Sequence, residues 1–544
     1  MDPLAGLRDA IRSAAAELAP GGDRTPALER PPQPDLGDYS TNAAMLLAPA
    51  VGQPPRQVAS ELRGRLEGRL GGAARVEVAG PGFLNLFLSD RWYRVGVMAI
   101  LAAGERFGAR GSPSGTRVLV EFVSANPTGP LHVGGGRNAA FGDSVARILA
   151  FAGDEVEREY YVNDAGRQVE LFAESVAARM RGAEPPADGY AGDYVIDLAG
   201  ELVEGGGAAD DLDELGRVAT EAMRRRIEAT LERFRVRFDT WFSERSLRAS
   251  GRIDEVIEDL RATGRVYERE GALWLRTSDL GDDKDRVLVR SDGEPTYFAV
   301  DTAYHRDKLA RGADRLVDPL GSDHHGYLPR LRAALAALGF EPERLEAPIM
   351  QFVHLVEGGE RARMSKRRGE FVTLDDLVDD IGVDAARFLM LQRSHDKTVD
   401  LDLTLARRQS QDNPVYYVQY AHARIASILR RAASEPRAAE EAIADRAGGE
   451  AALAAGAEPS ERALVRRLLD FPGEVRLAGE RLAPHRLCAY ATATAADFHA
   501  FYRDCRVLGA GAGLEDARLG LCLAARRTIA STLDLLGVAA PERM

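Results

Sequence analysis

The chain of 544 residues is 45% hydrophobic and 28% charged, the composition of an ordinary water-soluble protein with several domains. No run approaches the roughly 18 uninterrupted apolar residues of a membrane span, so we expect no membrane partner. The net charge of −13 argues against attraction of nucleic acid by bulk charge, and we expect no DNA partner. It does allow a local basic groove.

The ends of the chain bear on location and metal content. The first eighteen residues have an amphipathic helical pattern without the basic start and apolar stretch of a signal peptide, which indicates a cytoplasmic protein. Cys488, Cys505 and Cys522 are the only cysteines, and none belongs to a CxxC pair. We therefore expect neither a structural zinc site nor a disulfide framework.

Residues 1–110 are predicted to form an N-terminal α+β domain. Helical patterns occupy the start of the chain and residues 54–70. A β-like run over residues 75–88 follows, interrupted by Gly80-Pro81-Gly82. Residues 108–115, which contain three glycines and Pro113, are typical of a linker to the next domain.

Residues 111–372 alternate strand-like runs with amphipathic helices, which predicts an α/β domain with a Rossmann-type nucleotide-binding sheet. The expected strands are 118–123, 156–162, 273–275, 297–300, 315–318 and 349–356. A mostly helical, acidic stretch over about 168–247 is predicted to be an insertion between the two halves of the sheet. Such sheets bind ligands beyond the carboxyl ends of their strands, where the strand order reverses.

Residues 373–544 have helical periodicity almost throughout, which predicts an all-α helical bundle. The last helix should run from about residue 515 to 536 and stop at Gly537. The terminal residues 541–544 either pack at a specific place or fray, and fraying is the usual case.

The most informative segment runs from Asn126 to Arg137. An apolar strand, a glycine-rich turn with His132, and a helix follow one another, and this order places backbone N–H groups and a helix N-terminus around phosphate. His132 can hydrogen-bond a phosphate oxygen, and Gly134, Gly135 and Gly136 let a nucleotide lie against bare backbone. Taken alone, a structural turn histidine and a flexible turn explain these residues equally well or better.

A second basic segment, Arg363-Met364-Ser365-Lys366-Arg367, follows the expected strand at 349–356. Only four of the 71 basic residues are lysine: Lys284, Lys308, Lys366 and Lys397. A compact ammonium suits a mobile phosphate better than a guanidinium does, so a lysine at this point is less readily explained as a chance surface residue.

Together and in this order, the two segments resemble the HIGH and KMSKS signatures of class I aminoacyl-tRNA synthetases. The stretch from Ser124 to Gly134 is similar to the extended HIGH region of the arginyl-tRNA synthetases. Further stretches resemble this family in its own order, namely 161–164, 189–194, 281–286, 297–301, 323–327, 413–424 and 540–544. Two positions depart from the pattern: Gly135 replaces a second histidine, and the basic loop begins with Arg363 and ends with Arg367.

The resemblance implies roles for particular residues. Catalysis would fall to His132, Lys366 and Arg363. Contacts with ATP would come from Pro127, Thr128, Gly129, His132, Gly134, Gly135, Asp323, His324, Met364, Ser365 and Lys366. Arginine would be bound by Ser124, Asn126, Glu270, Tyr297 and Asp301. Contacts with tRNA would come from Phe83, Asn85, Asn413, Tyr416 and Tyr420.

Chemistry supports these roles and also leaves alternatives. A guanidinium has five donors and a fixed charge, so its pocket needs carboxylates and aromatic surface. Tyr297 and Asp301 share a face if their segment turns helical, although Asp301 could instead cap a helix that begins at Thr302. Phe83 and the tyrosines could equally be core residues, and His324 a turn residue.

The activity implied is ligation of L-arginine to tRNA-Arg through arginyl-adenylate, with ATP and its Mg²⁺, by a monomer whose activation step depends on bound tRNA. Two alternatives stay open. One is a class I synthetase for another amino acid such as cysteine or glutamine. The other is a synthetase-derived tRNA-binding protein that has lost activation, for which Gly135 and Arg363 are the only hints.

Overall fold

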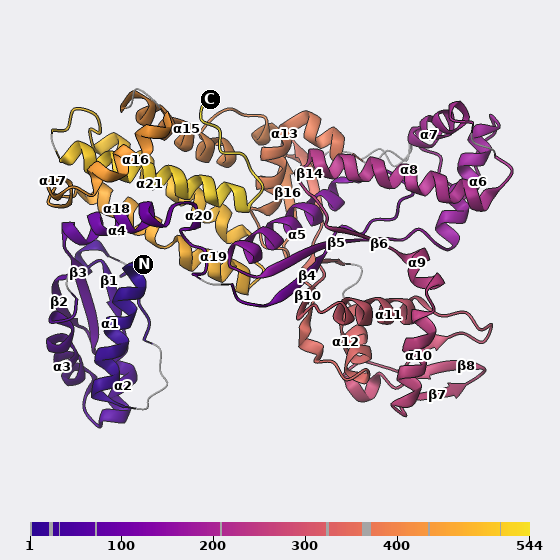
Figure 1. Ribbon diagram of the computed structural model, residues 1–544, viewed down its shortest axis with the longest axis horizontal. Helices are drawn as coiled ribbons and strands as arrows, with labels where there is room; N and C mark the ends of the chain where they lie inside the picture. Colours follow the sequence, from indigo (N-terminus) through magenta and orange to yellow (C-terminus); the bar gives the residue numbers. More distant parts are fainter. Residues whose placement is uncertain are drawn as a thin grey trace.

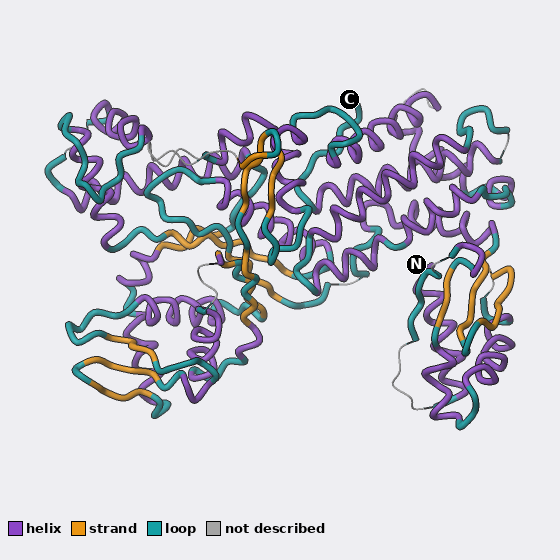
Figure 2. Tube along the Cα trace, turned by 180° about the vertical axis from the view of Figure 1, so that it is seen from behind, coloured by secondary structure: helices purple, strands orange, loops and turns teal. Residues whose placement is uncertain are grey.

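The computed structural model describes residues 3–20, 26–31, 33–70, 73–111, 113–206, 209–322, 326–361, 372–432, 436–511 and 513–544. A central α/β region joins a C-terminal helical bundle, and the N-terminal domain lies beneath that bundle (Figure 1). The N-terminal domain and the helices inserted in the central region lie at opposite ends of the molecule, as both views show (Figure 2). Among the described residues, no helix combines the length and the apolar character needed to cross a bilayer.

The N-terminal domain is α+β, as predicted. Its antiparallel sheet has the order β1-β3-β2 and is accompanied by helices α1, α2 and α3. These elements are α1 (Pro3–Leu18), η1 (Pro34–Leu36), β1 (Tyr39–Thr41), α2 (Ala43–Val51), α3 (Pro55–Glu67), β2 (Ala73–Ala79) and β3 (Phe83–Leu88). Helix α4 (Asp90–Ala103) then runs to the helical bundle, where Gly96 allows the Leu469 side chain to pack closely.

The central sheet has five parallel strands in the order β12-β10-β4-β5-β6. The strands are β4 (Arg117–Glu121), β5 (Glu155–Val162), β6 (Thr240–Ser243), β10 (Arg315–Val317) and β12 (Leu345–Glu346). Numbered along the chain, this is the order 3-2-1-4-5 read from β6 to β12, so the order reverses between β4 and β10. A ligand of such a sheet binds at that reversal, beyond the carboxyl ends of the strands.

Helices connect the strands of this sheet. Helix α5 (Val133–Phe151) joins β4 to β5, and three helices lie between β5 and β6: α6 (Arg167–Met180), α7 (Asp193–Glu204) and α8 (Leu212–Arg233). Strand β6 falls inside the predicted insertion and was missed. Its four residues are all half-buried, so they show no alternation between buried and exposed positions.

A lobe follows β6 and has a hydrophobic cluster of its own (Figure 1). It contains α9 (Glu244–Ala249), α10 (Arg252–Ala262), β7 (Val266–Arg269), β8 (Ala272–Leu275), η3 (Ser278–Leu280), β9 (Arg286–Val289), α11 (Tyr297–Ala310) and α12 (Tyr327–Ala337). The strand predicted at 297–300 is wrong, because these residues form the first turn of α11. The Thr296 side chain accepts a hydrogen bond from Ala299 N at 3.4 Å and begins the helix.

The strand predicted at 349–356 is divided into two. Strand β13 (Ile349–Met350) pairs with β11 (Leu320–Gly321), whereas β14 (Val353–Glu357) pairs with β16 (Val399–Asp402) and β15 (Glu360–Arg361). A single apolar run therefore serves two small sheets, a division that local pattern cannot reveal. The short helix η5 (Pro342–Arg344) precedes β12.

The C-terminal region is a helical bundle, as predicted, apart from β16. Its helices are α13 (Leu374–Leu391), α14 (Leu403–Ala406), α15 (Pro414–Ala432), α16 (Pro436–Ala447), α17 (Glu450–Leu453), α18 (Pro459–Leu469), α19 (Phe471–Glu480), α20 (His485–Asp504) and α21 (Leu514–Leu535). The chain end is bound rather than frayed. Gln419 Nε2 donates to Ala539 O at 2.9 Å, and His422 Nδ1 donates to Pro541 O at 2.8 Å.

One buried guanidinium joins the bundle to the central α/β region. Arg387 of α13 donates to Asp143 Oδ2 of α5 at 2.5 Å and to the carbonyl oxygens of Phe234 and Leu536 at 3.0 Å each. The following Gly537 has φ +66° and lies against the guanidinium, where a Cβ atom would come within 2.2 Å of its nitrogen. Removal of Arg387 would break its buried ion pair with Asp143, which is strongly destabilising.

Candidate nucleotide and amino-acid site

The backbone turns sharply where β4 ends, at the reversal of strand order. Val123 has φ +68° and Ser124 has φ +43°, a left-handed conformation that costs about 1–3 kcal/mol for such residues. Asn138 of α5 accepts from Val123 N at 2.7 Å and donates to Pro319 O, beyond β10, at 2.9 Å. The turn is therefore tied to both strands that flank the reversal.

His132 caps the N-terminus of α5. Its Nδ1 accepts a hydrogen bond from Gly135 N at 3.2 Å, so Nε2 carries the proton of the neutral ring and can donate to an incoming oxygen. The side chain keeps contact with solvent, but nearby protein atoms desolvate the imidazole and lower its pKa below the ordinary value. A neutral donor at a helix N-terminus suits a phosphate oxygen.

The three glycines after His132 serve different purposes. Gly136 is buried, and a Cβ atom there would lie 2.6 Å from the Leu374 side chain, so this position admits helix α13 rather than a nucleotide. That outcome corrects the prediction for Gly136. A Cβ atom at Gly134 would lie 2.9 Å from the His132 ring, so a side chain there would disturb the cap. Gly135 has only an ordinary contact with Leu131.

Residues 372–374, which come after the basic segment in sequence, pair with His132 and its neighbours. Arg363, Met364, Ser365 and Lys366 lie outside the described residues, as do Asp323 and His324 of the predicted ATP site. The chain that follows the basic segment is described. Thr373 forms an antiparallel bridge with His132, Val133 N donates to Val372 O at 3.3 Å, and Leu374 N donates to Leu131 O at 2.8 Å. Residues 372–374, a few positions after the basic segment in sequence, are therefore fixed at the start of α5.

Two tyrosines hold the loop that contains Pro127, Thr128 and Gly129. The hydroxyl of Tyr194, from insertion helix α7, donates to Thr128 O at 2.9 Å, and the ring lies against Gly129. The hydroxyl of Tyr160 donates to Ala125 O at 2.8 Å. Pro127 and Thr128 are buried beneath this cover. Sequence reasoning placed Tyr194 in a family stretch but gave it no role.

The residues predicted for the α-amino and carboxylate end of arginine lie in this turn. Ser124 Oγ donates to Glu121 Oε1 at 2.8 Å and accepts from Tyr161 N at 3.1 Å. Asn126 Nδ2 donates to Gln168 Oε1 of α6. Glu121, the last residue of β4, was not among the predicted residues, because it precedes the resembling stretch.

The residues predicted for the guanidinium end lie on the first turns of α11. Tyr297 is 65% exposed, and Asp301 follows it one turn later on the same face. Burial raises the pKa of Asp301 to about 6, although the Tyr327 hydroxyl donates to its carboxylate and opposes the shift. The alternative that Asp301 caps a helix is wrong, because Thr296 occupies that position.

Glu270 lies elsewhere in the lobe. It occupies the turn of the β7–β8 hairpin with φ +54°, next to Gly271 with φ +76°. Its carboxylate is exposed and lies 3.2 Å from Arg269 Nε. Its predicted contact with arginine therefore stays a prediction.

A group of charged side chains packs beneath the turn between β4 and α5. Among the described residues, Glu121, His305 and Asp318 bring potential metal-ligand atoms within 4.8 Å of one another. Lys308 Nζ bonds to both carboxylates, at 2.5 Å from Glu121 and 3.0 Å from Asp318. The Lys308 ammonium therefore supplies the positive charge that balances these two carboxylates.

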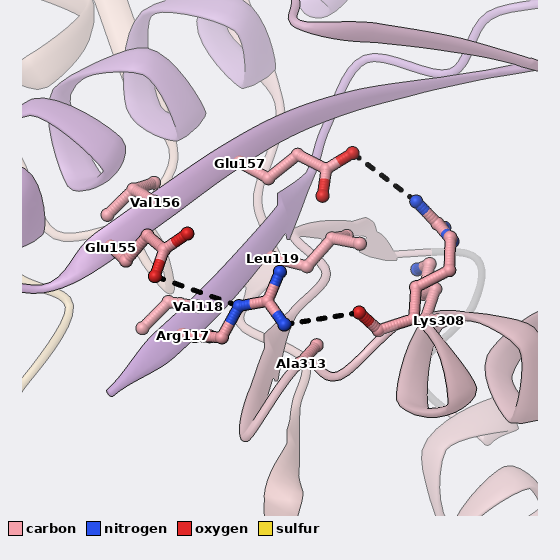
Figure 3. Close-up of a pocket in the computed structure, with 9 residues that line it drawn as sticks. Arg117, Val118, Leu119, Glu155, Val156, Glu157, Lys308 and Ala313 are labelled. Carbon is pink, nitrogen blue, oxygen red and sulfur yellow. Dashed lines mark hydrogen bonds and ion pairs between the residues drawn. The ribbon is translucent and has the colours of Figure 1, made fainter. Parts of the chain in front are cut away.

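Two open pockets lined by described residues lie away from this turn. One of about 70 Å³ lies near the first residues of β4 and β5 and is crossed by the ion pairs Arg117–Glu155 and Arg311–Glu157 (Figure 3). It is too small for a nucleotide and lies at the wrong ends of the strands. The other, of about 850 Å³, lies between α21, α16 and the chain end.

The predicted tRNA contacts are divided between exposed and enclosed residues. Phe83 is 38% exposed at the start of β3, so the alternative of a core residue is wrong. Asn85, two residues along the same strand, is buried. Asn413 is also buried, and its amide is engaged. It donates to Ala406 O and Arg408 O at 3.0 Å each and accepts from Val415 N at 3.2 Å.

An aromatic surface lies on α15 and α20. Tyr416 and Tyr420 stack with 6.2 Å between ring centroids and 8° between planes. The Arg424 guanidinium lies 4.5 Å from the Tyr420 ring centroid and 4.8 Å from that of Tyr502, which is 41% exposed. Stacked aromatics beside arginine suit unpaired bases. Tyr502 was missed, since only the tertiary fold brings it beside α15.

Three family models match consecutive parts of the chain. The arginyl tRNA synthetase N terminal domain matches residues 5–88. The catalytic domain of class I (R) tRNA synthetases matches residues 96–183 and 206–424, and the DALR anticodon binding domain matches residues 418–544.

Curated relatives and a solved structure agree with these models. The chain is 47% identical to an arginine–tRNA ligase of Desulforudis audaxviator, over 99% of this chain and 98% of the relative. It is also 47% identical to an arginine–tRNA ligase of Frankia alni, over 99% of this chain and 100% of the relative. The Thermus thermophilus arginyl-tRNA synthetase structure superposes with a TM-score of 0.78 over 100% of both chains, at 27% identity. The chain therefore belongs to the arginyl-tRNA synthetase family.

Proposed function

We propose that this protein is an arginine–tRNA ligase that uses the turn between β4 and α5 to activate L-arginine with ATP and then transfers arginine to the terminal adenosine of tRNA-Arg. The observation that carries the site assignment is the bridge between His132 and Thr373. The bridge lies at the N-terminus of α5, where strand order reverses, and Thr373 follows the basic segment by six residues in sequence. One nucleotide bound there can meet both signatures.

In the first step, the arginine carboxylate attacks the α-phosphate of ATP and pyrophosphate leaves. Both reactants are anionic, so catalysis consists of orientation and of stabilising charge on phosphate oxygens. His132 Nε2 donates to such an oxygen, while Gly134 and Gly135 let the nucleotide approach the backbone. Lys366, with Arg363, holds the departing β- and γ-phosphates. ATP enters as its Mg²⁺ complex, which neutralises part of the phosphate charge.

Arginine recognition is assigned to two ends of one subsite. Ser124 and Asn126 hold the α-amino and carboxylate groups. Asp301 and Tyr297 hold the guanidinium, with Glu270 as a further carboxylate. Support comes from the half-buried position of Asp301, whose partly desolvated carboxylate gains from a cationic partner. A neutral or shorter side chain would leave that carboxylate without a partner, so this pocket rejects it strongly.

The tRNA is assigned to two surfaces. Phe83 offers an exposed aromatic ring on the N-terminal domain for a loop base. Tyr416 and Tyr420, with Arg424 and Tyr502, offer a stacking surface on the helical bundle for anticodon bases. Asn85 and Asn413 are both buried, so we assign them to supporting the residues of these surfaces from beneath. We propose a cytoplasmic monomer.

Aminoacylation of bulk tRNA with each of the twenty amino acids tests this function directly. Esterification of tRNA with arginine alone supports it, and charging with cysteine or glutamine instead would assign the other class I activities. Binding of tRNA without any esterification would identify a protein that has lost activation. ATP–pyrophosphate exchange with arginine should be weak without tRNA and strong with it.

A further inference from the structure

The two ends of the proposed arginine subsite are connected by one buried ion cluster. It consists of Glu121, His305, Lys308 and Asp318, and we call it the Lys308 cluster. Glu121 is the last residue of β4 and Asp318 follows the adjacent parallel strand β10, at the reversal of strand order, while Lys308 and His305 come from α11. The Lys308 side chain is fully buried, and its Nζ bonds to both carboxylates, at 2.5 Å and 3.0 Å.

One branch of the cluster leads to the α-amino and carboxylate end. Lys308 bonds to Glu121 Oε2, which leaves Oε1 to accept from Ser124 Oγ at 2.8 Å. Ser124 Oγ in turn accepts from Tyr161 N at 3.1 Å. Ser124 has a left-handed backbone, so this turn keeps its shape only while such partners stabilise it. The orientation of the Ser124 hydroxyl therefore depends on Lys308 through Glu121.

The other branch leads to the guanidinium end. Asp318 Oδ2 accepts from Lys308 and also from His305 Nε2 at 2.7 Å. The opposite ring nitrogen, His305 Nδ1, donates to the backbone oxygen of Asp301 at 2.8 Å. Burial alone would raise the pKa of Asp318, but Lys308 and His305 lower it below the ordinary value, so the carboxylate stays ionised between them.

The choice of residue type at position 308 also points to a geometric role. The chain uses arginine for all but four of its 71 basic residues, yet lysine occupies this buried place. A single ammonium can reach Glu121, Asp318 and the Tyr304 ring, whose centroid lies 4.4 Å away. A guanidinium is larger and planar, so it would separate the two carboxylates.

We propose that Lys308 is a positioning residue that sets the spacing between the two ends of the amino-acid subsite, and thereby the length of side chain the enzyme accepts. This inference rests on the proposed function. Lys308 touches no substrate. It acts through Glu121 on Ser124, and through Asp318 and His305 on the helix that carries Asp301. Lys308 therefore controls how strongly the enzyme prefers arginine over a cationic amino acid whose side chain has a different length.

The test compares L-arginine with L-homoarginine, which carries one additional methylene. One methylene in a pocket is worth roughly 10–200-fold in kcat/KM, so the wild-type preference is measurable. The variants are Lys308→Arg, which keeps the charge, and Lys308→Met, which keeps the chain length. Lys397→Met removes the charge of a lysine that is 69% exposed and serves as control. Aminoacylation is measured with tRNA for both amino acids, and KM for ATP is measured with arginine.

Lys308→Arg should lower the preference for arginine over homoarginine by about tenfold, mainly through KM for arginine, while KM for ATP changes less than about twofold. Lys397→Met should keep the wild-type preference. If Lys308→Met does not fold, Lys308→Arg alone decides. An unchanged preference in a folded Lys308→Arg, or equal losses for arginine, homoarginine and ATP, would overturn the inference. A wild-type enzyme that charges no arginine would instead overturn the proposed function.

Discussion

Thr373 lies against His132 in an antiparallel bridge, although the whole lobe and most of the sheet separate them along the chain. Backbone hydrogen bonds on both sides of the bridge, from Val133 N to Val372 O and from Leu374 N to Leu131 O, fix the contact. Thr373 follows the basic segment by six residues in sequence. Helix α13 begins at Leu374, directly after the bridge, and belongs to the helical bundle, so the bridge connects the start of α5 to that bundle.

The carboxylate of Asp301 is expected to recognise the guanidinium. Asp301→Asn should lower kcat/KM for arginine about a hundredfold or more, because a partly desolvated site that loses its carboxylate binds a cation poorly. KM for ATP should change little. Steady-state aminoacylation at saturating tRNA measures both constants. Asp259→Asn, which changes an exposed carboxylate on α10, is the control. Equal losses for arginine and ATP would remove Asp301 from the pocket.

The raised pKa of Asp301 predicts a pH dependence. Burial raises this pKa to about 6, so the carboxyl is protonated below pH 6 in the free enzyme and ionised above it. A guanidinium binds the ionised form, so kcat/KM for arginine should fall about tenfold for each pH unit below 6. Asp301→Asn should abolish this dependence. A profile that is flat between pH 5 and 7 in the wild type would contradict the assignment.

Lys366 is predicted to act on the leaving pyrophosphate. Lys366→Ala should slow arginyl-adenylate formation about a hundredfold or more, since it removes a charge that acts on the transition state. The affinity for tRNA should stay within about twofold, because a single phosphate-directed lysine lies outside the proposed tRNA surfaces. Single-turnover pyrophosphate release and a filter-binding titration measure the two quantities. Unchanged activation kinetics would refute the role of Lys366.

The buried pair of Arg387 and Asp143 predicts a large effect on stability. Arg387→Ala removes the buried partner of Asp143, which keeps only Arg147 and Arg158 among the described residues, and takes the donors from two carbonyl oxygens, so the cost should be about 3–5 kcal/mol. Arg503→Ala removes a guanidinium that is 73% exposed and should change stability by less than about 0.5 kcal/mol. Thermal unfolding followed by circular dichroism compares the two. Equal unfolding temperatures would show that the buried pair contributes nothing.

The sequence by itself determined the features that depend on neighbours along the chain. The turn around His132 follows from a strand, a run of glycines and a helix start, and all three lie within about twenty residues. The helices at 3–18 and 55–67 and the hairpin at 73–88 follow from periodicity and turn residues in the same way. The order of these signals along the chain also carried the family resemblance.

Tertiary packing alone decided how distant segments share those features. Residues 297–300 look like a strand because they are apolar and aromatic, but they are apolar because helix α11 is buried on most of its faces. From sequence alone, the amide of Asn413 could contact a base. In the structure, its Nδ2 donates to the carbonyl oxygens of Ala406 and Arg408 instead. Lys308 stands in the sequence as an isolated lysine. Only the alignment of β4 with β10 places two carboxylates around it, because the strength of a buried ion pair depends on distances between chain segments and on their desolvation.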